Sequence, residues 1–181
     1  AYGDLLFRSY VLRDLIESEA EFAVVVDSSP TDENNRTVRD FAYCSRRDDR
    51  GLFGTPVLLK HVSSAADTAS AEAGAQGGES VVSPAAHGRW IGMLKVSRAG
   101  LTRLKELVSE LRGRADFDTL DVPHLLNELL ARGASIEVQY VHGHWRGVND
   151  LEDFRRAADF AHAQRRFGDP DESDTAAACD P

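Results

Sequence analysis

The uninterrupted apolar run in EFAVVVDSS, Glu21 to Ser29, constrains the fold more than any other feature of this chain. The run is rich in valine and contains no polar residue between Phe22 and Val26. This composition is typical of a β-strand that is buried on both faces of a sheet. We therefore expect a central strand here, with other elements packed against each face.

The rest of the chain alternates between strand-like and helix-like segments. Strands are predicted within residues 2–7, 37–45, 55–63, 88–97 and 135–145, and helices within 9–19, 98–111, 121–133 and 151–167. Ser9 is the expected N-cap of the first helix, and Gly133 is expected to end the third. Alternation of this kind predicts an α/β domain of three layers around a mixed, mostly parallel sheet.

Two segments lack the periodicity of packed elements. Residues 63–87 are dominated by alanine, serine and glycine, and we interpret them as a flexible insertion. Residues 167–181 contain five acidic residues and no lysine or arginine, which predicts a disordered acidic tail. The folded domain is therefore expected to span residues 1–166.

Charge and cysteine content exclude several classes of function. With 21 basic and 30 acidic residues the net charge is −9, which argues against nucleic-acid binding because that needs a basic surface. Cys44 and Cys179 form neither a disulfide framework nor a zinc pattern, and they suit a reducing cytoplasm. No apolar run reaches the roughly 18 residues of a membrane-spanning helix. The start, AYGDLLF, has neither an initiator methionine nor a signal peptide and is typical of the interior of a longer protein.

Polar residues at strand ends are the first candidates for a site. Asp4 lies at the end of a predicted strand, and Asn149 and Asp150 stand between another strand and the last helix. Ligands of open α/β sheets bind at the carboxyl ends of strands, so we expect these residues to lie close together. Asn149 or Asp150 can equally be the N-cap of the helix, and Asp4 a solvated or capping residue.

Basic residues and histidines supply further candidates. Arg46 and Arg50 share the loop CSRRDDRGLFG, where guanidinium groups suit phosphonate oxygens unless the loop is solvated and neutralised by its own aspartates. Lys95 lies inside the apolar strand WIGMLKVS, where it either reaches a phosphate or extends to solvent. His142 and His144 face the same side of an extended chain, but such a pair is more typical of packed, hydrogen-bonded histidines than of a zinc site.

A resemblance to a known family is carried, in this order, by the segments YGDLLF, VVVDSS, YCSR, GRWIGMLKVS and VQYVHGHWRGVNDLEDF. They resemble the nucleotidyltransferase domain fused behind phosphoenolpyruvate mutase in phosphonate biosynthesis, including that of fosfomycin. The resemblance covers Tyr2 to about Ala163, apart from the insertion. It implies a Rossmann-like nucleotidyltransferase fold and transfer of CMP from CTP to a phosphonate such as 2-hydroxyethylphosphonate, with release of pyrophosphate. It also implies Mg²⁺ as cofactor and an N-terminal mutase domain as partner in the same polypeptide.

The same resemblance implies metal-binding roles for three residues, and other residues are candidates for the acceptor by their own chemistry. Asp4 is similar to the first metal-binding aspartate, and Asn149 and Asp150 to the second metal position. Lys95 is expected to act with Asp4 in catalysis and to approach the acceptor phosphonate. The predicted substrate-binding residues are Arg46, Arg50, Asp27 and Trp145.

The chain departs from the family in two respects. Relatives commonly have an acid two residues after the tryptophan, where this chain has Gly147, so Asn149 or Asp150 must supply the second metal ligand. Relatives also begin with a Gly-rich loop bearing an arginine and then a Pro-Lys segment, and neither is found here. The resemblance therefore implies the C-terminal part of a transferase domain. The alternatives are a 2-aminoethylphosphonate or sugar-phosphate nucleotidyltransferase, or a non-catalytic interaction or regulatory module.

Overall fold

The structure is a computed structural model that describes residues 3–29, 40–49, 54–63 and 86–167. Three predictions fall mostly or wholly outside these described residues. They concern most of the insertion at 63–87, all but the first residue of the tail at 167–181, and Arg50. The strands are β1 (Leu5–Phe7), β2 (Phe22–Asp27), β3 (Phe41–Cys44), β4 (Leu59–Ser63), β5 (Gly88–Val96), β6 (Ile136–Val141) and β7 (Trp145–Gly147). The helices are α1 (Ser9–Glu17), α3 (Arg98–Leu111), the short 3-10 helix η2 (Phe117–Thr119), α4 (Val122–Ala131) and α5 (Leu151–Phe167).

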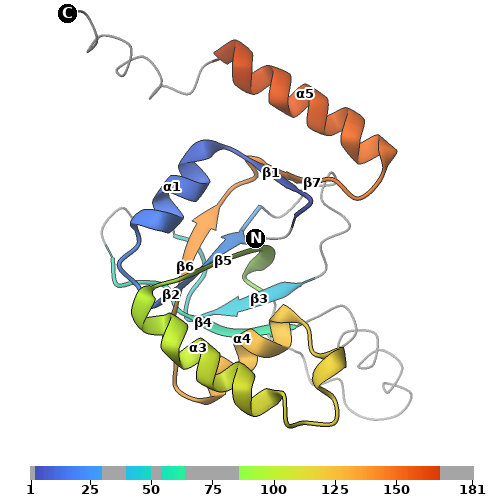
Figure 1. The fold of residues 1–181 in the computed structure, drawn as a ribbon. Coiled ribbons are helices and arrows are strands. Elements are labelled where there is room, and N and C mark those ends of the chain that lie inside the picture. The colour runs from blue at the N-terminus through green and yellow to red at the C-terminus, as the bar shows by residue number, and fades with distance from the viewer. Residues whose placement is uncertain (1–2, 30–39, 50–53, 64–85, 168–181) are drawn as a thin grey trace, which may run out of the picture.

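Five strands form a mixed sheet in the order β4-β3-β5-β2-β6. The mixed α/β architecture, a sheet flanked by helices, is as predicted (Figure 1). The expectation that the sheet is mostly parallel was wrong, because β2 and β6 are the only parallel neighbours among the described strands. The other three pairs of neighbouring strands, β4–β3, β3–β5 and β5–β2, are all antiparallel.

The strand predicted from EFAVVVDSS is buried at every position, as expected for the centre of the domain. Its side chains alternate between the two faces of the sheet. Phe22, Val24 and Val26 join one core cluster, whereas Ala23 and Val25 join the other. Figure 1 shows α1 on one side of the sheet and α3 and α4 on the other, which gives the three expected layers.

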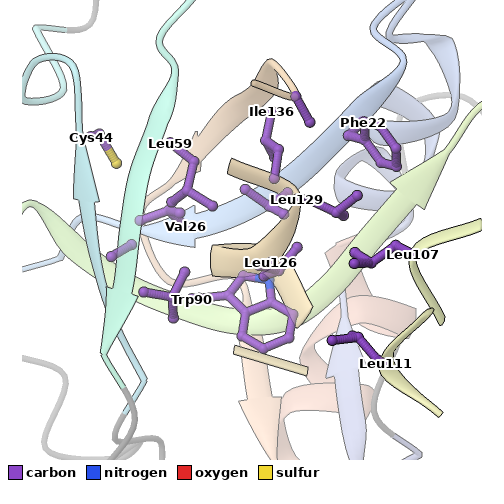
Figure 2. Packing of buried hydrophobic residues seen from close by; sticks show 14 residues of the cluster. Phe22, Val26, Cys44, Leu59, Trp90, Leu107, Leu111, Leu126, Leu129 and Ile136 are labelled. Carbon is purple, nitrogen blue, oxygen red and sulfur yellow. The ribbon is translucent and has the colours of Figure 1, made fainter. Parts of the chain in front are cut away.

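The larger core cluster packs α3 and α4 against the sheet. Figure 2 shows Leu107 of α3 and Leu126 of α4 near Trp90 of β5. Trp90 is 1% exposed, and its indole nitrogen donates a hydrogen bond to the backbone oxygen of Met93 at 3.0 Å. The indole therefore satisfies its one polar group inside an otherwise apolar cluster.

Helix ends follow the predicted capping residues in part. The side chains of Ser97 and Asp121 cap α3 and α4 by accepting hydrogen bonds from backbone N–H groups of the first turn. Gly133, with φ of +75°, stands just beyond the end of α4 as predicted. Ser9 was wrongly expected to cap α1. Arg8 occupies that position without a side-chain cap, and Ser9 is the first helical residue.

A separate two-stranded sheet joins β1 to β7. The strands are antiparallel, with Leu5 opposite Gly147 and Phe7 opposite Trp145. The sequence patterns did not predict β7 as a strand of its own, because three residues are too few to show a periodicity. Helix α5 follows, and Figure 1 shows it beside β7 and away from the five-stranded sheet. No described helix is long and apolar enough to cross a membrane.

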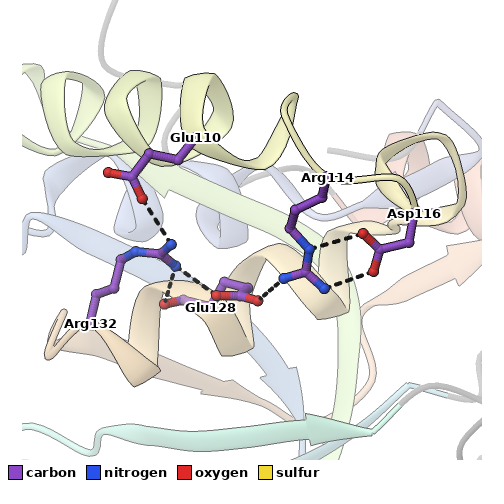
Figure 3. A network of polar contacts seen from close by, with 5 residues as sticks. All are labelled: Glu110, Arg114, Asp116, Glu128 and Arg132. Atoms are coloured by element: carbon purple, nitrogen blue, oxygen red, sulfur yellow. Dashed lines mark hydrogen bonds and ion pairs between the residues drawn. The ribbon is translucent and has the colours of Figure 1, made fainter.

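Exposed ion pairs tie α3 to α4 (Figure 3). Arg132 lies 3.0 Å from Glu110 and 2.6 Å from Glu128, and Arg114 lies 2.7 Å from Glu128 and 2.7 Å from Asp116. Glu128 therefore bridges both arginines. The hydrogen bond from Arg132, followed by that from Arg114, lowers the pKa of the Glu128 carboxyl group.

We expect Glu128→Gln to lower the melting temperature at neutral pH and to have much less effect at pH 3. A carboxyl group with a lowered folded pKa stabilises the fold above its unfolded pKa, about 4.3 for glutamate. That contribution is lost as the pH falls through the folded pKa. Thermal unfolding across this pH range, with the exposed Glu106→Gln on α3 as control, measures the difference. An equal loss at both pH values would contradict the ionic origin.

Candidate functional site at the carboxyl edge of the sheet

The parallel pair β2 and β6 brings two strand ends together at one edge of the sheet. Asp27, the last residue of β2, stands opposite Val141, the last residue of β6. The next residues, Ser28 and His142, therefore lie side by side, and the backbone N–H of Ser28 donates to the Val141 oxygen at 3.0 Å. Because ligands of open α/β sheets bind at the carboxyl ends of strands, this edge is a natural place for a site.

Asp27 is a buried carboxylate, only 3% exposed. One of its oxygens accepts hydrogen bonds from the backbone N–H groups of Ser29 (2.9 Å) and Gly143 (3.2 Å), and the other accepts from the indole nitrogen of Trp145 at 2.8 Å. Trp145 is itself 1% exposed. The predicted contact of Asp27 and Trp145 with substrate stays a prediction. In this structure both side chains are buried, and the hydrogen bonds that Asp27 accepts from Gly143 and Trp145 hold the turn at residues 142–145 in place.

That turn has an uncommon backbone conformation. Gly143 has φ of +69° and His144 has φ of +63°. Such a left-handed conformation raises the free energy of a residue with a Cβ atom by about 1–2 kcal/mol. It persists where the surrounding structure enforces it. The hydrogen bonds that Asp27 accepts from Gly143 and Trp145 supply this restraint. The buried carboxylate therefore fixes the position of the turn that carries His142 and His144.

Both histidines of the turn are exposed and hydrogen-bonded. In His142, Nε2 lies 2.9 Å from Oδ2 of Asp48 and Nδ1 lies 3.3 Å from Oγ of Ser28. In His144, Nδ1 lies 2.6 Å from the hydroxyl of Tyr10, whose pKa is raised by burial. These contacts agree with the interpretation of hydrogen-bonded histidines. In the described part of the chain, no three His, Cys, Asp or Glu side chains are grouped to hold a metal.

A second group of polar residues lies at the end of the two-stranded sheet of β1 and β7, which we call the β1–β7 ribbon. The backbone oxygen of Asp4 accepts a hydrogen bond from the N–H of Val148 at 2.8 Å. Asn149 and Asp150 follow directly, so the backbone of Asp4 lies next to this turn, as expected. Its setting differs from the prediction, because Asp4 precedes β1 instead of ending a strand, and the ribbon is separate from the five-stranded sheet.

Asp150 and its neighbours also begin helix α5. Oδ1 of Asp150 accepts a hydrogen bond from the backbone N–H of Asp153 at 2.7 Å, which is the geometry of an N-cap. Oδ2 of Asp153 in turn accepts from the backbone N–H of Asn149 at 3.1 Å and from its side-chain Nδ2 at 3.3 Å. The structure therefore supports the capping alternative for Asp150. A role in metal binding would use its second carboxylate oxygen.

The predicted part of Lys95 in catalysis stays a prediction, and its side chain lies away from the carboxyl edge of the five-stranded sheet. Its ammonium group donates hydrogen bonds to the backbone oxygens of Ser18 at 2.5 Å and Ala20 at 2.7 Å, just after α1. Lys95 pairs with Ala23, four residues before Asp27 along β2 and so about 13 Å from the carboxyl edge. The lysine stabilises the loop between α1 and β2.

We expect Lys95→Met to destabilise the fold by about 1–3 kcal/mol, because two carbonyl groups lose a charged donor. Lys105→Met, at an exposed position of α3, is the matched control. Urea unfolding measures both variants. A Lys95→Met variant as stable as the control would show that these hydrogen bonds contribute nothing.

Arg46 is held within its own loop. Its guanidinium donates to the carboxylate of Asp49 at 3.1 Å and to the backbone oxygen of Thr55 at 2.7 Å. The backbone oxygen of Arg46 accepts from the hydroxyl of Tyr140 at 2.8 Å, which anchors the loop to β6. The side chain is 36% exposed, so its predicted contact with an acceptor stays a prediction. Arg50 lies outside the described residues.

Sequence reasoning did not single out Ser28, Asp48 or Tyr10 as candidate site residues. Ser28 was visible as the residue after the buried strand and Asp48 as one of two loop aspartates. Their proximity to His142 depends on the parallel pairing of β2 with β6 and on the path of the loop after β3. No local pattern in the sequence encodes either feature.

Comparisons with known proteins leave the family open. No protein-family model matches the chain, and no curated protein matches it. Among solved structures, the chain is similar to the nucleoside-diphosphate-sugar pyrophosphorylase from Vibrio cholerae RC9, with a TM-score of 0.40 and 11% sequence identity. The likeness covers 88% of this chain and 53% of that one, so the chain spans about half the length of the structure it matches.

Proposed function

We propose that the chain is part of a nucleotidyltransferase that transfers CMP from CTP to a small phosphonate, with release of pyrophosphate. The observation that carries the proposal is the β1–β7 ribbon. It places Asp4 beside the turn at Val148–Asp150, although these residues are more than 140 positions apart in the sequence. Two of the segments that carry the family resemblance, YGDLLF and HGHWRGVNDLEDF, thus meet in space through strand pairing and through the backbone hydrogen bond between Asp4 and Val148.

The side chains at this place suit Mg²⁺ by their chemistry. Asp4, Asn149 and Asp150 offer carboxylate and amide oxygens, and Mg²⁺ prefers oxygen ligands, with one or two carboxylates and several waters. Asp4 and Asp150 are both exposed, so substrate phosphates can reach them. When bound, the ion would supply charge neutralisation between the acceptor oxygen and the triphosphate.

The acceptor needs little activation by the protein. A phosphonate oxygen is already an anion at neutral pH, so the main task of the chain is to position the reactants. Arg46, partly exposed and held by Asp49 and Thr55, is the described arginine that we assign to the acceptor phosphonate. A planar guanidinium matches two oxygens of such a group. Nothing in this assignment selects 2-hydroxyethylphosphonate over 2-aminoethylphosphonate.

A second candidate function is a non-catalytic interaction or regulatory module. It is favoured by the capping bond of Asp150 and by the bonds between Asn149 and Asp153, which employ the candidate ligands in helix formation. In such a module the acidic residues would only shape the start of α5. The two functions differ in whether these residues matter for chemistry or only for folding.

The experiment measures pyrophosphate release with CTP, Mg²⁺ and either phosphonate. We expect no pyrophosphate release by the 181-residue chain alone. Nucleotidyl transfer depends on backbone N–H groups that bind the triphosphate, and no Gly-rich loop with an arginine occurs in this sequence. The same chain extended by the residues encoded upstream of Ala1 should be active. Robust turnover by the 181-residue chain would contradict the need for such a loop.

A further inference from the structure

Asp27 and Trp145 join the two sheets of the molecule. Oδ2 of Asp27, the last residue of β2, accepts a hydrogen bond at 2.8 Å from Nε1 of Trp145, the first residue of β7. Both side chains are buried, so water does not compete for this bond. The bond therefore links the end of an interior strand of the five-stranded sheet to the beginning of a strand of the β1–β7 ribbon.

The acceptor side of the proposed transferase site is anchored to the same strand ends. The hydroxyl of Tyr140 in β6 donates to the backbone oxygen of Arg46 at 2.8 Å, which holds the loop that carries this arginine. Tyr140 stands opposite Val26, and the next residue, Val141, stands opposite Asp27. The loop and the ribbon are thus attached at neighbouring residue pairs of β2 and β6.

The ribbon transmits the orientation of Trp145 to the candidate metal residues. Backbone pairing holds β1 and β7 together, and the N–H of Val148 extends this pairing to the oxygen of Asp4. Val148 lies three residues, or about 10 Å, beyond Trp145, so a rotation of about 10° there moves this end of the ribbon by about 2 Å. A displacement of about 1 Å can slow catalysis by about 100-fold.

We propose that Asp27 and Trp145 are positioning residues for nucleotidyl transfer, an inference that rests on the proposed function. Their hydrogen bond fixes the angle of the ribbon relative to the five-stranded sheet. The candidate metal residues on the ribbon and Arg46 on the loop after β3 are thereby kept in one geometry. Asp27 and Trp145 act through the backbone that they hold and need no contact with the reacting atoms.

Two substitutions break this hydrogen bond from opposite sides. Trp145→Phe removes the indole donor and keeps an aromatic ring in the core. In Asp27→Asn we expect the amide oxygen to take the place of Oδ1, which accepts from the backbone N–H groups of Ser29 and Gly143. The amide NH2 group then faces the indole N–H, and two donors cannot bond to each other. Each variant therefore releases the ribbon and keeps the two backbone hydrogen bonds.

Trp90→Phe is the matched control. Trp90 is buried to the same extent as Trp145, and its indole donates to the backbone oxygen of Met93 in its own strand at 3.0 Å. The same substitution here removes one buried indole hydrogen bond and the same side-chain volume, but it leaves the ribbon attached. Thermal unfolding should show a comparable fall in Tm for Trp90→Phe and Trp145→Phe. Any difference in catalysis between them then reports positioning and not stability.

The first test is steady-state kinetics of the protein extended upstream of Ala1, with CTP, Mg²⁺ and 2-hydroxyethylphosphonate. We expect Trp145→Phe and Asp27→Asn each to lower kcat by about 10-fold or more, with KM for both substrates within about 2-fold of the parent, because each substrate keeps its own contacts. The double variant should be no slower than the slower single variant, since both remove one interaction. A parent-like kcat in Trp145→Phe, or an equal loss in Trp90→Phe, would overturn the proposal.

The second test needs no catalysis and uses the 181-residue chain with Cys179→Ser. Spin labels are attached through Arg155→Cys on α5 and Glu106→Cys on α3, both exposed positions, and double electron–electron resonance measures the distance between them. Helix α5 reports on the ribbon because it follows β7 directly and its Phe160 ring lies 4.8 Å from the guanidinium of Arg8, next to β1.

We expect a narrow distance distribution in the labelled parent and in Trp90→Phe, and a broader one in Trp145→Phe. A broad distribution in the parent, or an unchanged one in Trp145→Phe, would show that the bond does not hold the ribbon and would overturn the proposal. Absence of any CMP transfer by the folded extended protein would instead count against the proposed function, so the two failures are distinguishable.

Discussion

Asp27→Ala is expected to destabilise the fold by at least about 3 kcal/mol, because three donors lose their acceptor and each unsatisfied buried group costs about 1–3 kcal/mol. The donors are the backbone N–H groups of Ser29 and Gly143 and the buried indole of Trp145. The turn with positive φ at Gly143 and His144 also loses its restraint. Equilibrium unfolding in urea measures the change.

Two further variants make this test specific. Asp118→Ala removes an exposed carboxylate from η2 and should change stability by less than about 0.5 kcal/mol. Trp145→Phe removes only the indole donor. The loss of unfolding free energy in the double variant should therefore be smaller than the sum of the losses in Trp145→Phe and Asp27→Ala. If Asp27→Ala were as stable as the parent, Asp27 would not hold the turn.

Asp4→Asn is expected to reduce pyrophosphate release by about 100-fold or more in the protein extended upstream of Ala1, as removal of one preorganised electrostatic stabiliser does elsewhere. The side chain of Asp4 is exposed, so the melting temperature should stay close to that of the parent. Steady-state kinetics with CTP and a phosphonate measure the loss. Asp118→Asn, an exposed carboxylate of η2, is the control and should retain full activity.

The elements with long, regular patterns were predictable from the sequence. The apolar run before Asp27 indicated a buried strand, and helical spacing indicated α3 and α5 with the bounds that the structure shows. The direction of strand pairing was not predictable in the same way. It depends on how distant segments pair across the sheet, and no periodicity within a single strand encodes whether a neighbour runs parallel or antiparallel.

The candidate site was predictable only in part. The proximity of Asp4 to the turn at Asn149 and Asp150 was expected because each was placed at a strand end, although the two-stranded ribbon that brings their backbones together was not foreseen. Lys95 shows what the sequence alone does not reveal about a candidate residue. A lysine in an apolar strand must reach a partner, but the sequence does not reveal that its partners are the backbone oxygens of Ser18 and Ala20. Burial of Asp27 and Trp145 likewise arises from packing between distant segments.

Transfer of CMP to a phosphonate by the extended protein tests the central claim most directly. The measurement is formation of CMP-phosphonate, followed by mass spectrometry alongside pyrophosphate release, with 2-hydroxyethylphosphonate, 2-aminoethylphosphonate and a sugar phosphate as competing acceptors. We predict that a CMP-phosphonate forms in an amount equal to the pyrophosphate released, and that both fall together in Asp4→Asn. Pyrophosphate release that is equally fast in Asp4→Asn, or a folded extended protein that forms no nucleotidyl product from any acceptor, would contradict the account.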